Sequence, residues 1–380
     1  MSDHASDFVL QAISFDTLEG WKDDDPSGPF EVMRCCRRQI TDVKPYRAGS
    51  LGLSSEDLLP LLIAAEDFTP SSPASARGFF ETHCRPFLIR RKDGNPGFVT
   101  AFYEPEIEVS ERPDDVFRFP FYRRPDDLID LDDGNRPAEL DDAYAFGRRH
   151  DDGRIGAYPD RRAIDQGFLE GRGLEIAWAK SKVDVFFVHV QGAARLRYRN
   201  GRIGRITYAA KAGHPFSAIG KLLIECGEID RAEISMQSIR AWLARNPERV
   251  DEVLWHNRSY IFFREAPSRA IGSRTADPEV GPIAAAKVPL LAGRSLAVDR
   301  LIHTFGFPFF IRAESLTHLD QGRPFRRLML ALDTGSAIVG PVRGDIFTGS
   351  GYMAGESAGT VRNDADFAIL IPNAAAGRFD

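Results

Sequence analysis

The stretch Arg327–Gly359, RLMLALDTGSAIVGPVRGDIFTGSGYMAGESAG, joins an apolar segment to a glycine-rich one. Five of the six residues 328–333 are apolar and the sixth is Asp333, a pattern typical of a buried strand. Seven glycines follow within 25 positions. Because glycine loses more backbone entropy on folding than other residues, this density indicates tight turns or a backbone that approaches a ligand closely. The segment therefore predicts a β-rich C-terminal region.

Two carboxyls in this stretch are candidates for chemistry. Asp333 and Asp345 are the only acids between Leu328 and Gly355. Asp345 follows Arg343-Gly344, a pair that we expect to turn the backbone sharply, and precedes two apolar residues. Dehydration there would raise the pKa of the carboxyl, as a general acid working near neutral pH requires. Alternatively, either acid caps a turn or accepts hydrogen bonds from backbone amides.

The length and charge of the chain limit its class. A chain of 380 residues exceeds what one core usually organises, so we expect two domains or one domain with a large insertion. The 49 basic residues nearly balance the 55 acidic ones, and no run of five Lys or Arg occurs, which argues against nucleic acid or an anionic membrane as the ligand. A neutral or glycan-like ligand fits this balance. No apolar run reaches the roughly 18 residues of a transmembrane segment.

Local patterns predict elements along the chain. Ser54 and Asp57 form a capping pair, which predicts a helix from there to about residue 63. Residues 98–104 predict an apolar strand that ends before Pro105. Residues 126–152 are acidic and predict a solvated surface loop.

The middle of the chain predicts a β meander followed by helices. Residues 185–191 are interpreted as an alternating strand, and Asn200-Gly201 is a hairpin turn pair. Helical spacing follows at 219–226 and at 239–243.

The four cysteines, Cys35, Cys36, Cys84 and Cys226, have no metal-site spacing and are interpreted as packing thiols. Their even number also permits disulfides. We expect no metal or organic cofactor.

The segment Leu332–Ser336, LDTGS, matches the loop that activates water in pepsin-like proteases. That chemistry needs two carboxylates that share a proton, and no second Asp-Thr/Ser-Gly occurs in the chain. A homodimer that uses Asp333 from each copy is the remaining form of this alternative.

Eight motifs occur in the order of one known family: FVTAFYEP (98–105), YPDRRAIDQG (158–167), DVFFVHVQGAARL (184–196), GHPFSAIGKLLIECGEI (213–229), SMQSIRAWLARNP (235–247), SYIFFRE (259–265), VPLLAGRSLAVDR (288–300) and LDTGSAIVGPVRGDIFTGSG (332–351). From about Phe80 to Pro372 the chain resembles the membrane-bound lytic murein transglycosylase A family. It departs from the family pattern at Ala101-Phe102, where Gly-Tyr is usual, and at Ser336, where a second glycine is common.

The resemblance implies a mainly β fold with peripheral helices. It implies a double-psi β-barrel domain formed by residues 1–105 and 233–380, with a second β-rich domain, residues 106–232, inserted into it. A glycan groove would lie between the two domains.

The resemblance also implies the activity. A peptidoglycan lytic transglycosylase cleaves the β-1,4 bond between N-acetylmuramic acid and N-acetylglucosamine without water and leaves 1,6-anhydromuramic ends. Asp345 matches the family's catalytic acid, which would serve first as acid and then as base, while Asp333 would support the loop. Because the attacking C6 hydroxyl is already tethered to the reacting sugar, a single carboxyl is sufficient. A peptidoglycan-binding protein without catalysis is the alternative.

Seven residues are candidates for contacts with the glycan, although each also has an ordinary structural interpretation, such as strand alternation or an element cap. They are Thr100, Phe102, Tyr103, Gln191, Gln237, Thr334 and Gly335.

The implied substrate predicts a periplasmic or cell-envelope location, yet residues 1–15 show no signal-peptide pattern. An upstream start, a removed leader or a non-standard export route would each reconcile the two. Protein partners in cell-wall synthesis cannot be named from the sequence.

Overall fold

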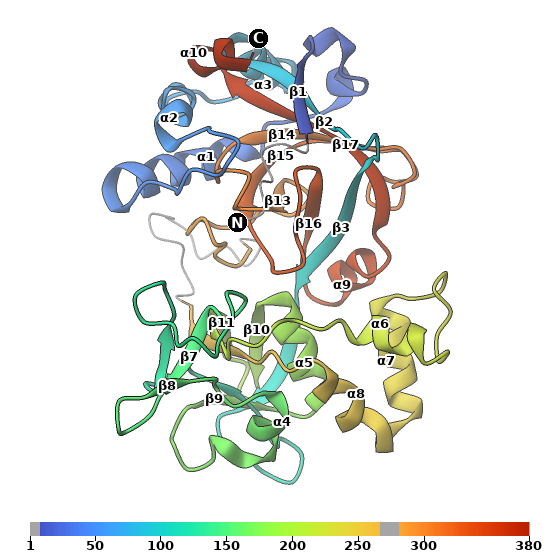
Figure 1. Ribbon diagram of the computed structural model, residues 1–380. Coiled ribbons are helices and arrows are strands. Elements are labelled where there is room, and N and C mark those ends of the chain that lie inside the picture. The colour runs from blue at the N-terminus through green and yellow to red at the C-terminus, as the bar shows by residue number, and fades with distance from the viewer. Residues whose placement is uncertain (1–7, 267–280, 380) are drawn as a thin grey trace. The chain divides into compact units, whose positions relative to one another are not determined.

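The computed structural model describes residues 8–266 and 281–379, which form two units (Figure 1). Within the described residues, unit 1 contains 8–103 and 281–379, and unit 2 contains 104–266. The inserted part was predicted to end at residue 232, and this boundary is wrong. Residues 233–266 also belong to unit 2, because the strand at 261–265 pairs with the strand at 203–211 of that unit.

In the described residues of unit 1, eight strands form one sheet: β1 (Phe8–Ala12), β2 (Cys84–Arg91), β3 (Gly97–Glu104), β13 (Ser295–Val298), β14 (Pro308–Ala313), β15 (Phe325–Asp333), β16 (Arg343–Ser350) and β17 (Arg362–Pro372). Their order is β1-β2-β17-β14-β15-β13-β16-β3, and β17 also pairs with β3. This extra pairing closes six strands into a ring. The predicted barrel-type, mainly β fold is confirmed.

The ring closes because β17 is long enough to have different neighbours along its length. Its first residues pair with β3, with Thr100 opposite Arg362, and its later residues pair with β14 and β2. Strands from both ends of the sequence thereby become neighbours in one barrel.

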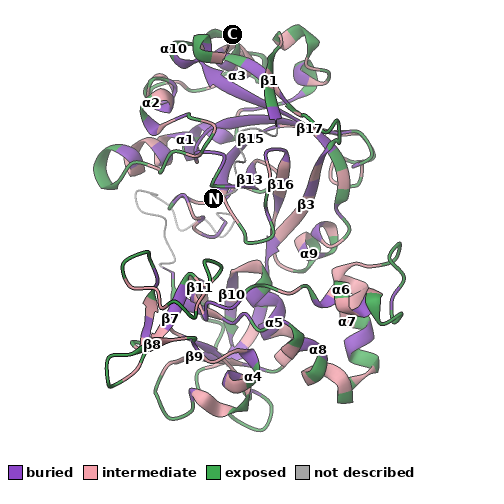
Figure 2. Ribbon diagram, viewed as in Figure 1, coloured by how far each residue is buried: buried purple, intermediate pink, exposed green. Residues whose placement is uncertain are grey.

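The core of unit 1 is formed by apolar side chains from these strands and from segments packed on them, such as Phe30 and Leu58. Figure 2 colours much of these strands as buried. Each residue of 328–332 is at most 1% exposed, which confirms the buried strand predicted there. Trp21 lies edge-on to Phe310, with 5.6 Å between the ring centroids. Full burial of such a ring contributes about 1.5–3 kcal/mol.

The helices of unit 1 in the described residues are α1 (Pro29–Arg38), α2 (Ser55–Ala64), α3 (Pro73–His83), α9 (Tyr352–Ala358) and α10 (Asn373–Ala376). The capping pair predicted for α2 is confirmed. The Ser54 side chain accepts a hydrogen bond from the amide of Asp57, whose carboxylate accepts one from the amide of Ser54.

Unit 2 contains two sheets in its described residues. The strands are β4 (Glu106–Ser110), β5 (Phe119–Tyr122), β6 (Leu128–Asp130), β7 (Phe146–Arg149), β8 (Ile155–Gly156), β9 (Glu175–Ala179), β10 (Ala193–Tyr198), β11 (Ile203–Lys211) and β12 (Ile261–Glu265). Six form the sheet β12-β11-β10-β4-β9-β5, and three form β6-β7-β8. The predicted hairpin at Asn200-Gly201 is confirmed, since it joins the antiparallel pair β10 and β11. The acidic stretch 126–152 was predicted to be a loop only, but it contains β6 and β7.

The helices of unit 2 are α4 (Arg161–Ala163), α5 (Lys182–Gln191), α6 (Ile219–Glu225), α7 (Met236–Arg245) and α8 (Val250–His256). Helices α6 and α7 confirm the predicted helical spacing. The strand predicted at 185–191 is wrong, because these residues lie in α5. The helix begins after Ser181, whose side chain accepts a hydrogen bond from the amide of Asp184. It ends at Gly192, whose backbone is in the left-handed conformation (φ 77°).

Helix α5 places His189 beside a buried arginine, Arg161, which is 2% exposed. The Arg161 guanidinium donates to the carbonyl oxygens of Asn257 (3.0 Å) and Ser259 (2.6 Å), and its Nη1 lies 3.1 Å from Nδ1 of His189. Burial and the charge of Arg161 hold the pKa of His189 well below its usual value. The neutral imidazole is therefore the form that can accept this hydrogen bond.

All four cysteines are free. Cys36 and Cys84 are buried and Cys35 is partly buried, as the predicted packing role requires, but Cys226 is exposed, so the prediction is wrong for that residue. Within residues 8–266 and 281–379, no helix has the length and apolar character needed to cross a membrane.

Candidate functional site

Asp345 lies on β16, between β13 and β3 of the barrel in unit 1. The preceding Gly344 lies within the strand, so the sharp turn predicted at Arg343-Gly344 is wrong. A Cβ atom at Gly344 would lie 2.9 Å from side-chain atoms of Leu296 and Phe367. The glycine is therefore required by close packing rather than by a turn.

The carboxyl of Asp345 is held by a hydroxyl from a neighbouring strand. Oγ1 of Thr100, on β3, donates a hydrogen bond to Oδ1 of Asp345. The same hydroxyl accepts a hydrogen bond of 2.7 Å from Nη2 of Arg343. Arg343 precedes Asp345 by two residues on β16, so both side chains lie on the same face of the strand.

The surroundings of Asp345 raise its pKa, as the sequence analysis predicted. Burial of the carboxyl is the largest cause, and it outweighs the hydrogen bond from Thr100 and the charge of Arg343, which both lower the pKa. Burial also lowers the pKa of Arg343, although the nearby carboxylate opposes that change. The site thus contains a half-buried acid whose protonated form is favoured at higher pH than in water.

Asp333, at the end of β15, accepts hydrogen bonds from backbone amides. Its Oδ1 accepts hydrogen bonds from the amides of Ala285 (3.1 Å) and Thr334 (2.9 Å). Burial raises its pKa to about 6, and the charge of Asp345 adds a smaller increase. Asp333 therefore holds the backbone at Ala285 and Thr334, and its supporting role in a reaction stays a prediction.

The loop between the two acids is fixed by residues that sequence reasoning did not single out. The carboxylate of Asp299 accepts a hydrogen bond from the amide of Gly340 (2.8 Å). Nε2 of His303 lies 2.8 Å from the carbonyl oxygen of Pro341. Burial lowers the pKa of His303 to about 4, so the ring is neutral near pH 7 and donates from Nε2. The start of β16, and with it Arg343, is thereby held in place.

Arg343 was noted at the sequence level only for its predicted turn. Side chains two residues apart in a strand lie on the same face, so Arg343 could have been identified as a neighbour of Asp345 from a predicted strand over both residues. Nothing in the sequence marked His303, because a lone histidine in an apolar segment is an ordinary core residue.

The other predicted residues of β3 pack within unit 1. The Phe102 ring lies 5.3 Å from that of Phe347, measured between centroids. Tyr103 is 8% exposed and packs so closely on α9 that a Cβ atom at Gly355 would lie 2.7 Å from its ring. The Tyr103 ring therefore offers little free surface on which a sugar could stack.

Of the remaining candidates, Thr334 and Gly335 follow β15, and Gly335 is exposed. Gln191 and Gln237 belong to unit 2. Gln191 is the last residue of α5, and so it does not end a strand as predicted, while Gln237 lies in the first turn of α7. The predicted site residue that the structure brings into hydrogen-bond contact with Asp345 is Thr100.

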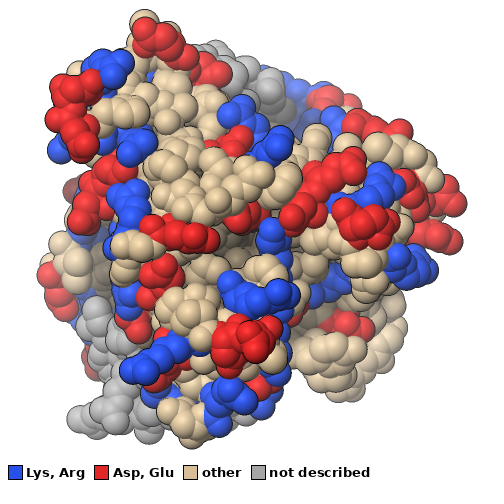
Figure 3. Space-filling model, turned by 90° about the horizontal axis from the view of Figure 1, so that it is seen from below, with Lys and Arg blue, Asp and Glu red and all other residues tan. Residues whose placement is uncertain are grey.

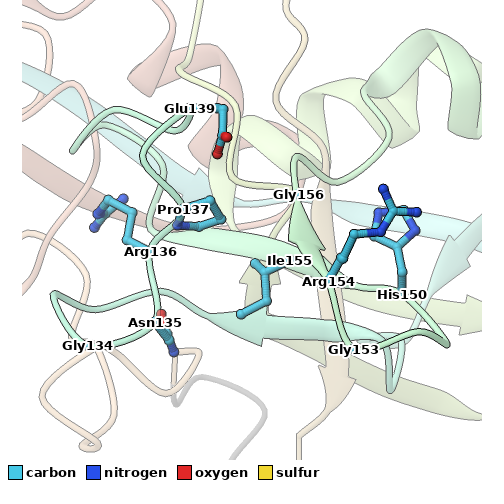
Figure 4. Close-up of a pocket in the computed structure, with 10 residues that line it drawn as sticks. All are labelled: Gly134, Asn135, Arg136, Pro137, Glu139, His150, Gly153, Arg154, Ile155 and Gly156. Atoms are coloured by element: carbon cyan, nitrogen blue, oxygen red, sulfur yellow. The ribbon is translucent and has the colours of Figure 1, made fainter.

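A hollow of about 600 Å³ in unit 2 lies between the β7–β8 region and the preceding loop (Figure 4). Its cationic residues are engaged within the chain. Arg136 donates to the carbonyl oxygen of Asp141 (3.0 Å), and Arg154 pairs with Asp152 (2.6 Å). The hollow is lined by none of the predicted site residues.

Fold and site together define a β-barrel protein with a half-buried acid held by a threonine hydroxyl. Comparisons with known proteins specify the family. The family model described as the MltA-specific insert domain matches residues 98–264, and the 3D domain model matches residues 294–371. The crystal structure of a membrane-bound lytic murein transglycosylase from Agrobacterium tumefaciens is similar to this chain, with 61% identity, 98% of this chain and 100% of that chain covered, and a TM-score of 0.91.

More distant relatives agree. MltA from Neisseria gonorrhoeae is 30% identical, with 96% of this chain and 93% of that chain covered and a TM-score of 0.76. Membrane-bound lytic murein transglycosylase A from Vibrio cholerae is 33% identical over 70% of this chain, and the match spans 63% of the relative's length. The Escherichia coli K12 protein of that name is 31% identical over the same shares. The chain belongs to the membrane-bound lytic murein transglycosylase A family.

Proposed function

We propose that this chain is a peptidoglycan lytic transglycosylase that cleaves the β-1,4 bond between N-acetylmuramic acid and N-acetylglucosamine and leaves a 1,6-anhydromuramic end. Membership of the family supports the reaction class. The observation that carries the proposal is the raised pKa of Asp345, whose carboxyl is half-buried and bonded to Thr100. Such a carboxyl can hold a proton at a pH where an exposed aspartate has lost it.

The reaction uses one proton and returns it. The carboxyl of Asp345 donates its proton to the glycosidic oxygen, the bond from C1 to that oxygen breaks, and the electron pair stays on the oxygen. The carboxylate then takes the proton of the C6 hydroxyl of the same sugar while O6 bonds to C1. No water enters, and no metal or organic cofactor is needed for the proton transfers.

Tethering explains why a second carboxyl is unnecessary. Ordinary glycosidases use one acid and a second carboxylate that attacks or activates water. A nucleophile within the reacting sugar has a high effective concentration, so positioning replaces the second group. Asp333 is then free to hold the loop through Ala285 and Thr334.

The charge distribution suits a largely neutral glycan. Basic and acidic side chains are interspersed across the face shown in Figure 3. Many charged side chains of the described residues form ion pairs, such as that of Arg202 with Glu111 (2.7 Å). Anionic polymers are bound by surfaces with an excess of one sign. We infer that Gln191, Gln237, Thr334 and Gly335 contribute glycan contacts and that the protein acts in the cell envelope, where its substrate lies.

Mass spectrometry of purified sacculi digested by the protein tests the proposal. We expect muropeptides that weigh one water less than hydrolytic products. Hydrolytic products would replace the proposal with a glycosidase, and binding without products would favour a non-catalytic peptidoglycan-binding protein. Cleavage of peptide bonds that is inhibited by pepstatin-type compounds would favour the dimeric protease.

A further inference from the structure

The hydroxyl of Thr100 has its hydrogen-bonding direction fixed by Arg343. A guanidinium donates but cannot accept, so the hydroxyl proton of Thr100 cannot point toward Nη2 of Arg343, which lies 2.7 Å away. The other partner of this hydroxyl among the described residues is Oδ1 of Asp345. The proton of Thr100 therefore points at Oδ1.

Arg343 is itself held in this position. Its Nη1 donates to the carbonyl oxygen of Gly344, and its guanidinium lies 5.5 Å from the centroid of the Phe98 ring. Within the described part of the chain it makes no direct ion pair, and Asp345 is the acid whose charge acts on it. A fixed cation thus lies beside the acid and contacts it through Thr100.

We propose that Arg343 is a positioning residue that acts through Thr100: it directs the threonine proton onto Oδ1 of Asp345 and leaves Oδ2 as the oxygen that exchanges a proton with the glycan. This inference deepens the proposed function and rests on it.

The consequence for the reaction is that one oxygen serves both steps. Oδ2 gives its proton to the leaving glycosidic oxygen and later receives the proton of the C6 hydroxyl. Oδ1 accepts the hydrogen bond from Thr100 in both steps. It stays unprotonated, because a proton bound to Oδ1 would clash with the hydroxyl proton that Thr100 directs at the same oxygen.

The charged groups around Asp345 determine the pH dependence. Arg343 lies on the same strand, Asp333 lies on β15 with Lys287 near it, β3 contributes the neutral Thr100, and β13 places Ala297 opposite. Burial raises the pKa of Asp345, and the charge of Arg343 lowers it. Removing that charge should therefore raise the pKa of Asp345 further. The alkaline limb of the activity profile should move upward by about 1 pH unit.

Kinetics on soluble glycan strands test the proposal with Arg343→Gln, Arg343→Lys, Thr100→Val and Thr100→Ser. Arg90→Gln, which changes an exposed arginine on β2 of the same sheet, outside the closed ring, is the matched control and should behave as wild type. We expect Thr100→Val to lower kcat by about 10- to 100-fold with little change in KM, and Thr100→Ser to recover most of that loss, because it keeps the hydroxyl.

Arg343→Gln should lower kcat by about 10-fold and shift the alkaline limb upward, whereas Arg343→Lys should leave the limb near its wild-type position because it keeps the charge. Because the positioning effect of Arg343 acts through Thr100, a double variant that combines Arg343→Gln with Thr100→Val should have a plateau kcat no lower than that of Thr100→Val alone, although its alkaline limb should still move upward.

Multiplying losses in the double variant, or an unshifted pH profile in Arg343→Gln, would overturn the proposal. If Arg343→Gln does not fold, as judged by circular dichroism, Arg343→Lys decides alone and combined with Thr100→Val. A kcat lowered by up to about 10-fold that causes no further loss in the Thr100→Val background supports positioning, and losses that multiply overturn it. If wild-type protein gives no anhydro products at all, it is the proposed function that fails.

Discussion

Asp333 and Asp345 are both register partners of Ala297, one on each side of β13. Neighbouring strands lie about 4.8 Å apart, so the backbones of the two acids are separated by roughly 10 Å. The two acids also bind different partners, Thr100 for Asp345 and backbone amides for Asp333. Each acid is therefore expected to have its own role.

Asp345→Asn should abolish turnover. The amide preserves the shape and still accepts the hydrogen bond from Thr100, but it cannot donate a proton to the leaving oxygen. Because the same group serves both steps, release of anhydromuropeptides should fall by at least about 10²- to 10⁴-fold. Asp67→Asn, at an exposed acid of unit 1, is the control and should retain wild-type activity. Near-normal release by a folded Asp345→Asn protein would refute the assignment.

Asp333→Asn should reduce turnover less than Asp345→Asn does. The Oδ1 atom of asparagine can accept the same amides of Ala285 and Thr334, so the loop keeps its support. Side-by-side rates on one batch of sacculi make the comparison. The protease alternative demands the opposite order, and equal complete loss at both positions would leave the division of roles without support.

Asp333→Asn should also change how stability depends on pH. The pKa of Asp333 is about 6 in the folded protein and 3.8 as its ordinary value. Between these values the folded state binds more protons than the unfolded state, so this group's contribution to stability is present below pH 3.8 and is lost as pH rises to about 6. The loss amounts to at most about 3 kcal/mol. Chemical unfolding at about pH 4 and about pH 7 should show the variant gaining relative to wild type at the higher pH; a constant difference would contradict the raised pKa.

Patterns carried by neighbouring residues predicted local structure well. The pair Ser54 and Asp57 marked the start of α2, and Asn200-Gly201 marked a hairpin, because the groups that decide these structures lie within a few residues of each other. The buried strand at 328–332 was equally plain, since both of its faces are apolar.

The same reasoning failed at α5 for a physical reason. Val185, Phe186, Phe187, Val188 and His189 are all buried, so the segment shows neither the period of a half-buried strand nor that of a surface helix. The informative signals were at its ends, where Ser181 caps the helix and Gly192 ends it.

The site was predictable only in part. The resemblance pointed to Asp345, but the hydrogen bond from Thr100 joins residues 245 positions apart, and no local pattern encodes it. Arg343 was assigned to a turn because glycine beside it suggested one, whereas the packing of Leu296 and Phe367 explains Gly344. The end of the inserted unit was misplaced because the pairing of β12 with β11 is also a long-range contact.

Two glycines should respond in opposite ways to alanine. Gly192 ends α5 with φ at 77°, where a side chain is strained, so Gly192→Ala should destabilise the protein by about 1 kcal/mol. Gly78 lies inside α3 with no atom within 4 Å of a new Cβ, so Gly78→Ala should stabilise by about 0.5–1 kcal/mol. Urea unfolding measures both, and equal signs would contradict the assigned backbone conformations.

His189 should make the protein less stable in acid. Its folded pKa is held well below 6.5, so between that value and 6.5 the unfolded state binds more protons. The contribution is therefore present above about pH 6.5 and is lost as pH falls, by up to about 1.4 kcal/mol for each pH unit. His189→Gln keeps an acceptor for Arg161 and should flatten the acid side of the stability curve. His256→Gln, at an exposed histidine of α8, should not; identical curves for wild type and His189→Gln would disprove the assignment.

The closed ring of unit 1 has a consequence for protein synthesis. β3 leaves the ribosome long before β16 and β17 are made, and it must wait for both with its hydrogen-bonding edges unpaired. Unit 2, encoded by one continuous stretch, can meanwhile assemble from shorter-range contacts. Thr100 is therefore translated 245 residues before the carboxyl that it binds. A nascent chain released before β16 lacks Asp345, so premature termination yields a fragment without the proposed catalytic acid.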